Sequence, residues 1–260
     1  MPELCEVEYY RRAAEGTVGR TVSRVQAGDA WYCKGETTPA ELERRLPGRR
    51  IDAARRRGKL LLLDLDDGTT LGLRFGMTGR LIVDGIATID QLEYDSATDD
   101  PRWDRFALGF DAGGHLTIRD SRRLGGVELD PNDERLGPDA RTLSEGDLLV
   151  ALSGARTAVK ARLLDQSRIA GLGNLLTDEI LWRAGVDPGG PAAAVGVDRI
   201  ERLAEVIRDT VEELLAAGGS HRGTLQSQRR PDGRCPRCDV ALDRRTIGGR
   251  TTYSCPRHQN

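Results

Sequence analysis

Four residues near the C-terminal end have the types and spacing of a metal site. Cys235 and Cys238 form a C-x-x-C hook, and Cys255 and His258 form a C-x-x-H hook after 16 intervening residues. Two such hooks can place four soft ligands around one zinc ion, which closes a tetrahedral site and leaves no open position for catalysis. Disulfide bonding is the alternative, and it is disfavoured in a cytosolic chain. The pattern predicts one structural Zn²⁺ that acts as the core of a small ribbon.

The stretch MPELCEVE, at the beginning of the sequence, has a second kind of chemistry. Removal of Met1 would leave Pro2 with a terminal secondary amine, and a terminal amine has a pKa of about 7.7–8.0. Part of it is then unprotonated near neutral pH and can attack an aldehyde carbon, giving a cationic iminium that acts as an electron sink. In the simpler interpretation, Pro2 is merely tolerated and Glu3 to Glu6 open a helix, where acidic side chains suit the dipole. These eight residues alone favour the simpler interpretation.

A third candidate site is the stretch GLGNLLTDEILWRAG. Gly171 and Gly173 lie between two apolar helical patterns, and Asn174 begins the second pattern. Glycines let a ligand approach the backbone closely, and the N–H groups at a helix N-terminus suit a phosphate. Taken alone, a tight connection between two helices explains the same residues.

Two regions of different periodicity must position these candidates. A short helix is expected over residues 3–14, and strand-like sequence follows over residues 21–128. Asp-Gly and Gly-Gly pairs at residues 67–68 and 113–114 are typical of hairpin turns. This half of the chain predicts a β-sandwich or flattened barrel with an N-terminal helix.

The second half is helical until its last 40 residues. A Pro/Asp/Gly-rich stretch is followed by helical periodicity, and the arginine-rich tail then returns to turns. The predicted fold class is therefore α+β and multidomain. Helices are expected over residues 145–154, 160–169, 174–185 and 197–219. The expected parts are a β-sandwich domain (1–130), a linker (131–141), a helical domain (142–220) and a zinc β-hairpin (221–260).

Composition limits the function classes. No apolar run approaches the ~20 residues of a membrane span and no signal peptide is evident, so we expect a soluble cytoplasmic protein with no membrane partner. The net charge of −2 gives no sign of a nucleic-acid partner, but residues 220–260 hold nine arginines and three aspartates. That local excess predicts a polyanion-binding surface. Lysine occurs only at Lys34, Lys59 and Lys160 among 39 basic residues; coding bias explains the total, yet arginine cannot replace a titratable amine.

Six motifs follow one another along the chain: MPELCEVE, RRRGKLLLL, FGMTGRL, RDSRRLGG, GLGNLLTDEILWRAG and the two metal-ligand hooks. Taken in this order, they resemble the formamidopyrimidine-DNA glycosylase/endonuclease VIII family of DNA repair enzymes. The resemblance covers nearly the whole chain. It implies a catalytic β-sandwich domain, a helix–two-turn–helix DNA-binding domain and a zinc-finger β-hairpin.

The resemblance implies base excision by a bifunctional glycosylase and abasic-site lyase. The damaged nucleotide would be flipped from the duplex into a pocket. Pro2 would attack the sugar C1′ and displace the base, and Glu3 would move protons. Lys59 would bind the phosphate beside the lesion, and Glu6 would support the terminal amine. The resulting iminium would allow strand cleavage by β- and δ-elimination.

The resemblance also implies how the chain holds DNA. Met77 and Arg122 would fill the space left by the flipped nucleotide, and Leu124 would belong to the same probing loop. There are simpler alternatives: Met77 could fill a gap in the core, and Arg122 and Arg123 could be a pair of solvated surface side chains. The implied partner is double-stranded DNA with damaged bases or abasic sites, bound by a monomer in the bacterial cytoplasm and nucleoid. The residues implied to contact phosphates are Arg123, Lys160, Asn174 and Arg250.

Several positions depart from the family pattern. Only 15 residues separate Gly219 from Cys235, which is too few for the loop that closes over 8-oxoguanine in formamidopyrimidine glycosylases. The start MPEL points the other way, toward that same branch. We give the missing loop more weight, because it would touch the base, and we expect an open lesion pocket not specialised for 8-oxoguanine. The substituted positions are Cys5 and Ser121 for proline, Leu124 for phenylalanine and His258 for cysteine.

Two other functions compete with this interpretation. A DNA-binding protein of the same fold with reduced catalysis is disfavoured, because a pure binder has no use for Pro2, Glu3 and Lys59. A zinc-ribbon transcription factor explains only the last 40 residues.

Overall fold

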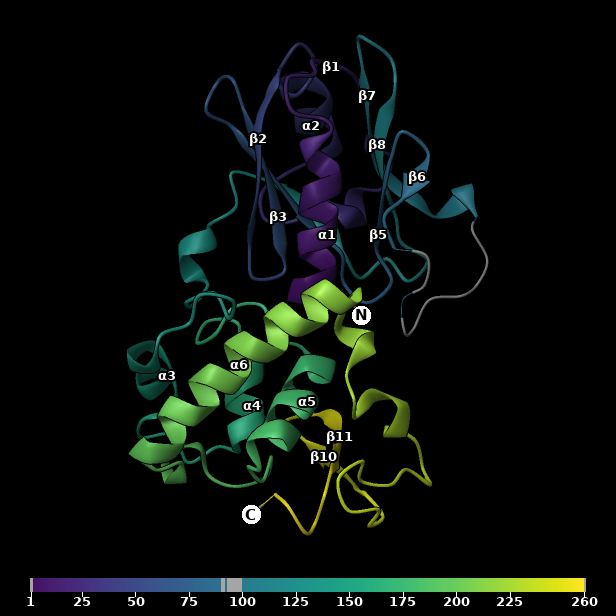
Figure 1. Ribbon diagram of the computed structural model, residues 1–260. Coiled ribbons are helices and arrows are strands. Elements are labelled where there is room, and N and C mark those ends of the chain that lie inside the picture. Colours follow the sequence, from purple (N-terminus) through teal and green to yellow (C-terminus); the bar gives the residue numbers. More distant parts are fainter. Residues whose placement is uncertain (1, 90–91, 93–99, 260) are drawn as a thin grey trace. The chain divides into compact units, whose positions relative to one another are not determined.

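Two compact units make up the chain in the computed structural model, which describes residues 2–89, 92 and 100–259 (Figure 1). The first unit comprises residues 1–2 and 6–133, and the second comprises residues 3–5 and 134–260. The boundary lies within the linker predicted at residues 131–141. The finer separation of residues 142–220 from residues 221–260 stays a prediction.

The first unit is a sandwich of two antiparallel sheets. One sheet has five strands in the order β1-β7-β8-β5-β6, and the other has four in the order β2-β3-β4-β9. The predicted turns at residues 67–68 and 113–114 join β3 to β4 and β7 to β8. The β-sandwich prediction is therefore confirmed. The strands are β1 (Val22–Gln26), β2 (Ile51–Arg57), β3 (Leu60–Leu65), β4 (Thr70–Arg74), β5 (Arg80–Val83), β6 (Ile86–Ala87), β7 (Asp104–Phe110), β8 (His115–Arg119) and β9 (Gly126–Leu129).

Helix α1 (Leu4–Glu15) contributes one apolar face to the core of this sandwich. Val7, Tyr10 and Ala14 are fully buried among side chains of both sheets. The ring of Tyr10 lies 4.5 Å from that of Phe75, and its hydroxyl donates to the carbonyl of Gly79. The α1 contacts therefore help to fix the loop that follows β4.

Helix α2 (Pro39–Arg45) lies in a stretch that was expected to be strand-like. The Thr38 hydroxyl accepts a hydrogen bond from the Glu41 amide, and the Glu41 carboxylate accepts one from the Thr38 amide. Pro39 occupies the first helical turn, where its fixed φ suits the helix. This capping box was a legible sequence signal, and it determines the local structure despite the strand-like surroundings.

The second unit is built on four helices. Helices α3 (Glu145–Leu152), α5 (Asn174–Ala184) and α6 (Val197–Ala217) begin at the predicted positions. Helix α4 (Val159–Leu164) ends five residues early, because the Asp165 carboxylate accepts hydrogen bonds from the amide and hydroxyl of Ser167 and closes a turn. Figure 1 shows α6 as the long light-green helix, and it packs on α5 and α3.

The tail forms the predicted hairpin of β10 (Asp243–Ile247) and β11 (Arg250–Ser254). Ile247 pairs with Arg250 across the Gly248-Gly249 turn, whose two φ angles of 56° and 71° favour glycine. Its small core contains two of the expected metal ligands. The buried residues of that core are Trp182, Leu225, Cys235, Leu242, Tyr253 and Cys255. In the described part of the chain, no helix is both long and apolar enough to cross a membrane.

Candidate functional site

Glu3 is bound at the N-terminus of α5. Its side chain is fully buried, and its carboxylate accepts hydrogen bonds from the amides of Gly173, Leu175 and Leu176 at 2.8–3.0 Å. The first amides of a helix have no partner within the helix, and the positive end of its dipole favours a negative charge. The carboxylate is therefore held in one orientation, in the residue that directly follows Pro2.

The two glycines before α5 make room for these N-terminal residues. A Cβ on Gly173 would lie 2.2 Å from Cδ of Glu3, and a Cβ on Gly171 would lie 2.6 Å from Cδ1 of Leu4. The Leu4 amide also donates to the Gly171 carbonyl at 3.1 Å. From the sequence, the glycine pair could either admit a phosphate to the helix N-terminus or form a tight connection between two helices, and in the structure it leaves room for Glu3 and Leu4.

Lys160 lies in a buried network and does not reach the surface. Its side chain is 0% exposed, and its ammonium donates to Oδ1 of Asp178 at 2.6 Å, Oγ1 of Thr252 at 2.8 Å and the carbonyl of Thr251 at 3.2 Å. Burial lowers the pKa of Lys160, whereas the charge of Asp178 raises it. The structure therefore corrects the expected direct phosphate contact, because all three ammonium hydrogens already have acceptors inside the protein.

Asn174 and Lys160 both hold the strand that carries Arg250. Nδ2 of Asn174 donates to the Thr251 carbonyl at 3.1 Å, while its Oδ1 is buried with no hydrogen-bond partner in the part of the chain that the structure describes. Arg250 itself is exposed at the beginning of β11. Lys160 and Asn174, which were both predicted to contact phosphates, therefore both bind the carbonyl of Thr251, the residue next to Arg250.

The buried carboxylate at the centre of this network was not predicted. Asp178 also accepts hydrogen bonds from Nε of Arg229 at 3.1 Å and from the Tyr253 amide at 3.4 Å. Arg229 lies over the ring of Tyr253, 5.6 Å from its centroid. The sequence contained one sign of this role, since Asp178 interrupts an apolar helical pattern and an acidic side chain there needs a buried partner.

The four predicted metal ligands come together. Their ligand atoms all lie within 4.8 Å of one another. Sγ of Cys238 is 3.7 Å from Sγ of Cys255, and Nδ1 of His258 is 3.7 Å from Sγ of Cys235 and 3.4 Å from Sγ of Cys255. A tetrahedron with metal–sulfur bonds of ~2.3 Å has edges of roughly 3.8 Å. The cluster therefore fits a four-coordinate metal ion.

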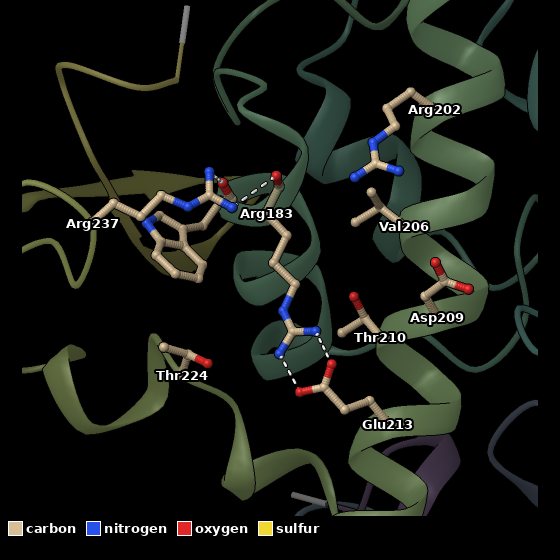
Figure 2. Close-up of a pocket in the computed structure, with 9 residues that line it drawn as sticks. Arg183, Arg202, Val206, Asp209, Thr210, Glu213, Thr224 and Arg237 are labelled. Carbon is tan, nitrogen blue, oxygen red and sulfur yellow. Dashed lines mark hydrogen bonds and ion pairs between the residues drawn. The ribbon is translucent and has the colours of Figure 1, made fainter.

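The C-terminal end of α5 is joined to this cluster. Nε1 of Trp182 donates to Sγ of Cys235 at 3.4 Å, and Arg237 donates to the carbonyls of Trp182 and Arg183. Figure 2 shows Arg183 making two contacts with Glu213 in the adjoining cavity of about 440 Å³. The Arg237 guanidinium donates hydrogen bonds to carbonyls at the C-terminal end of α5, and the Arg183 guanidinium pairs with a carboxylate of α6. Both therefore help to hold α5, α6 and the metal cluster together.

In the first unit, two predicted DNA-probing loops are held together by buried Asp120. Its carboxylate accepts hydrogen bonds from the Thr78 hydroxyl at 2.6 Å and from the amides of Arg122 and Gly125 at 3.2 and 2.8 Å. Thr78 follows Met77, which is half-buried, whereas Arg122, Arg123 and Leu124 are exposed. Only part of the Met77 side chain is therefore packed in the core, and the rest is accessible to solvent.

The remaining predicted residues also lie in the first unit. Pro2 and Glu6 are buried. Lys59 is half-buried and follows Gly58, whose positive φ of 58° forms the turn between β2 and β3. Arg123 makes a two-pronged ion pair with Asp29 at 2.7 and 2.8 Å, so a phosphate would have to compete with that carboxylate.

Comparison with known proteins finds matches that together cover nearly the whole chain. Residues 1–127 match the model of the formamidopyrimidine-DNA glycosylase N-terminal domain, and residues 136–226 match that of the H2TH domain of the same enzymes. The formamidopyrimidine-DNA glycosylase of Paracoccus denitrificans is 37% identical over 98% of this chain and 99% of its own length. The chain belongs to the formamidopyrimidine-DNA glycosylase family.

Two further relatives support this family assignment. The formamidopyrimidine-DNA glycosylase of Chloroflexus aurantiacus is 34% identical over 98% of the chain. Among solved structures, a Lactococcus lactis Fpg mutant in complex with DNA containing Fapy-dG is 26% identical, with a TM-score of 0.85 over 100% of both chains. The resemblance read from the motifs is therefore confirmed for the family and for the fold.

Proposed function

We propose that this member of the formamidopyrimidine-DNA glycosylase family is a bifunctional glycosylase and abasic-site lyase acting on double-stranded DNA. The observation that carries the proposal is the buried Glu3 carboxylate, which three α5 amides orient in the residue next to Pro2. Lactococcus lactis Fpg has been solved with an abasic-site DNA and with an oxidised-pyrimidine DNA, which supports such a substrate class here. We expect the protein to act as a monomer in the bacterial cytoplasm.

The proposed reaction begins at Pro2, which must be the first residue of the mature chain. Its nitrogen lone pair forms a bond to the sugar C1′ and the glycosidic bond breaks, while the proton that the Pro2 nitrogen loses passes to the departing base. Glu3, once it has taken a proton from solvent water, gives that proton to the ring oxygen, so that the sugar opens to the iminium. The cationic nitrogen acidifies the hydrogen on C2′; its loss expels the 3′ phosphate, and a second elimination expels the 5′ phosphate.

The other site residues hold the substrate in this proposal. Lys59 binds the phosphate beside the lesion, and Glu6 supports the terminal amine. Lys160 has a changed role, since it positions β11 from the protein interior. The residues proposed to contact DNA are Met77, Arg122, Arg123, Leu124, Asn174 and Arg250.

We propose that the Cys₃His cluster binds one zinc ion. The ion would stabilise the fold and take no part in the reaction, because the four protein ligands complete its coordination. Its role is to keep Arg250 in place on a hairpin whose apolar core is small. Metal analysis should find one zinc per chain, and chelation should weaken DNA binding; undiminished affinity in zinc-free protein would contradict this role.

The short connection between α6 and the hairpin supports an open lesion pocket. Two 3₁₀ turns, Ser220–Arg222 and Gln226–Gln228, occupy six of the 15 residues between Gly219 and Cys235. The amides of Thr224 and Leu225 are held by the Glu179 carboxylate at 3.1 and 2.8 Å. Little chain is left to close over a flipped base, so discrimination should depend mainly on how easily the base leaves the duplex.

Lesion preference can be tested by single-turnover excision on matched duplexes. We expect faster release of oxidised pyrimidines, ring-opened purines or bulkier adducts, and faster cleavage at abasic sites, than release of 8-oxoguanine opposite cytosine. Fastest release of 8-oxoguanine would contradict the open-pocket proposal and leave the glycosylase proposal intact.

Borohydride trapping on abasic-site DNA tests the chemistry itself. Wild-type protein should form a covalent adduct, Pro2→Gly should strongly reduce base excision, and Glu3→Gln should bind DNA without turnover. Binding with no adduct from wild-type protein would support the alternative, a damaged-DNA-binding protein of the same fold with reduced catalysis. Full strand cleavage by Glu3→Gln would remove Glu3 from the mechanism.

A further inference from the structure

Trp31 is the only aromatic residue among the exposed large hydrophobic side chains of the described residues. It is 70% exposed and belongs to a short 3₁₀ turn, Ala30–Tyr32. A single exposed hydrophobic side chain needs no functional explanation by itself. The surroundings of Trp31 are what distinguish it.

The Trp31 turn is anchored to the two probing loops. The hydroxyl of buried Tyr32 donates to Oδ2 of Asp120 at 3.2 Å, and the same carboxylate binds Thr78, Arg122 and Gly125. Burial, and then the charge of Asp120, raise the pKa of Tyr32 well above its ordinary value, so the hydroxyl remains a donor. Segments near residues 32, 78 and 120–125 are thus held by one buried group.

A second tie fixes the position of Trp31 relative to Arg123. Oδ1 of Asp29 accepts the Trp31 amide at 3.2 Å, and the same carboxylate holds the Arg123 guanidinium. Close backbone packing adds to this, since a Cβ on Gly125 would lie 2.3 Å from the Tyr32 hydroxyl oxygen. Trp31 is therefore presented by a fixed support and not by a loose loop.

The charge around the indole suits a polyanion. Nζ of Lys34 lies 5.5 Å from the Trp31 ring centroid and donates to the Trp31 carbonyl at 2.8 Å. Arg122 and Arg123 are exposed in the adjoining loop, and Leu124 is 51% exposed there. Exposed aromatic rings beside cations are the composition with which proteins stack on bases and follow a nucleic-acid backbone.

We infer that Trp31 is a further DNA-contacting residue, which stacks on a base or sugar of the duplex beside the loop of residues 122–124. This inference rests on the proposed function. The indole supplies the aromatic surface that the loop itself lacks, because Leu124 has no ring with which to stack. Lys34 at the indole and the exposed Arg122 of the adjoining loop supply positive charge for the neighbouring phosphates.

The test compares Trp31→Ala with Ile86→Ala, a matched control that removes an equally exposed side chain (73%) from β6 of the same unit. The ligand is a duplex with a tetrahydrofuran abasic-site analogue. Trp31→Ala should weaken binding about tenfold, the size expected for the loss of one base–aromatic stack. Ile86→Ala should bind like wild type, and both variants should keep the wild-type melting temperature.

Fluorescence separates direct contact from an indirect effect. DNA should quench the wild-type tryptophan emission, and Trp31→Phe should lose that change while retaining most of the affinity, since only Trp103 and Trp182 then remain. Equal affinities for Trp31→Ala and Ile86→Ala, or unaltered quenching in Trp31→Phe, would overturn the inference alone. A wild-type protein that fails to bind the duplex would overturn the proposed function together with it.

Discussion

Each unit contains a buried aspartate that organises the segments around it, and the two are satisfied differently. Asp120 of the first unit is bound by hydroxyls and backbone amides, from Tyr32, Thr78, Arg122 and Gly125. Asp178 of the second unit is bound by two cations, and both aspartates are at most 1% exposed. The contrast is between a carboxylate held by neutral dipoles and one held by charges.

This difference indicates what each group does. Neutral donors come from the loops themselves, so Asp120 fixes loop conformation and leaves the arginines of those loops exposed. Lys160 and Arg229 bring their own charges into the interior, where each one loses favourable hydration. Asp178 offsets that loss of hydration, because it is the counter-charge of both cations. It therefore stabilises the folded second unit, and it contributes to DNA binding only indirectly, through β11.

The largest effect is expected from Asp178→Asn. The substitution keeps the size of the side chain but leaves Lys160 and Arg229 buried without a counter-charge. Breaking a buried ion pair in this way costs about 3–5 kcal/mol. Urea unfolding should show that loss in the free energy of unfolding. A loss below about 1 kcal/mol would contradict the role of Asp178 as the counter-charge for Lys160 and Arg229.

A smaller effect is expected from Lys160→Met, which retains the length and apolar stem of the side chain. Asp178 then keeps Arg229 and the Tyr253 amide, so the loss should be about 1–3 kcal/mol. A double-mutant cycle with Asp178→Asn should give a coupling energy of about 0.5–3 kcal/mol. Strict additivity of the two losses would contradict a shared network.

Asp120→Asn should affect function more than stability. The asparagine amide group would face hydroxyl and N–H donors, which leaves one or more of them without an acceptor, at a cost of about 1–3 kcal/mol. Affinity for a lesion-containing duplex should fall further than in Asp178→Asn, since the loops of residues 76–79 and 120–126 lose their common anchor. Equilibrium binding on matched duplexes, beside urea unfolding, checks both halves of this prediction.

Tyr32→Phe should have the smallest effect. It removes one of four hydrogen bonds to Asp120 and leaves the ring in the core, so unfolding should become easier by about 1 kcal/mol. Thr78→Val, which removes the shorter bond at 2.6 Å, is the companion variant and should cost at least as much. Identical stability of Tyr32→Phe and wild type would show that the amides alone satisfy Asp120.

Local patterns in the sequence were sufficient for much of this protein. The metal-ligand hooks, the hairpin turns at residues 67–68, 113–114 and 248–249, and the beginnings of α3, α5 and α6 were all predicted from short stretches. Each depends on residues close together in the chain, where spacing, turn propensity and periodicity act directly. The capping box of α2 was equally local and was passed over because its surroundings read as strand.

Which charged groups are exposed depends on contacts between residues far apart in the chain. Glu3 meets amides 170 to 173 residues away, Tyr32 meets a carboxylate 88 residues away, and Lys160 meets Thr252 92 residues away. No local pattern distinguishes a lysine that faces phosphate from one enclosed by three acceptors, because burial is a property of the packed neighbours. Short sequence motifs were enough to identify the family and to nominate candidate reactive groups. The packing of the chain decides which of those groups are buried as supports and which are exposed at the surface.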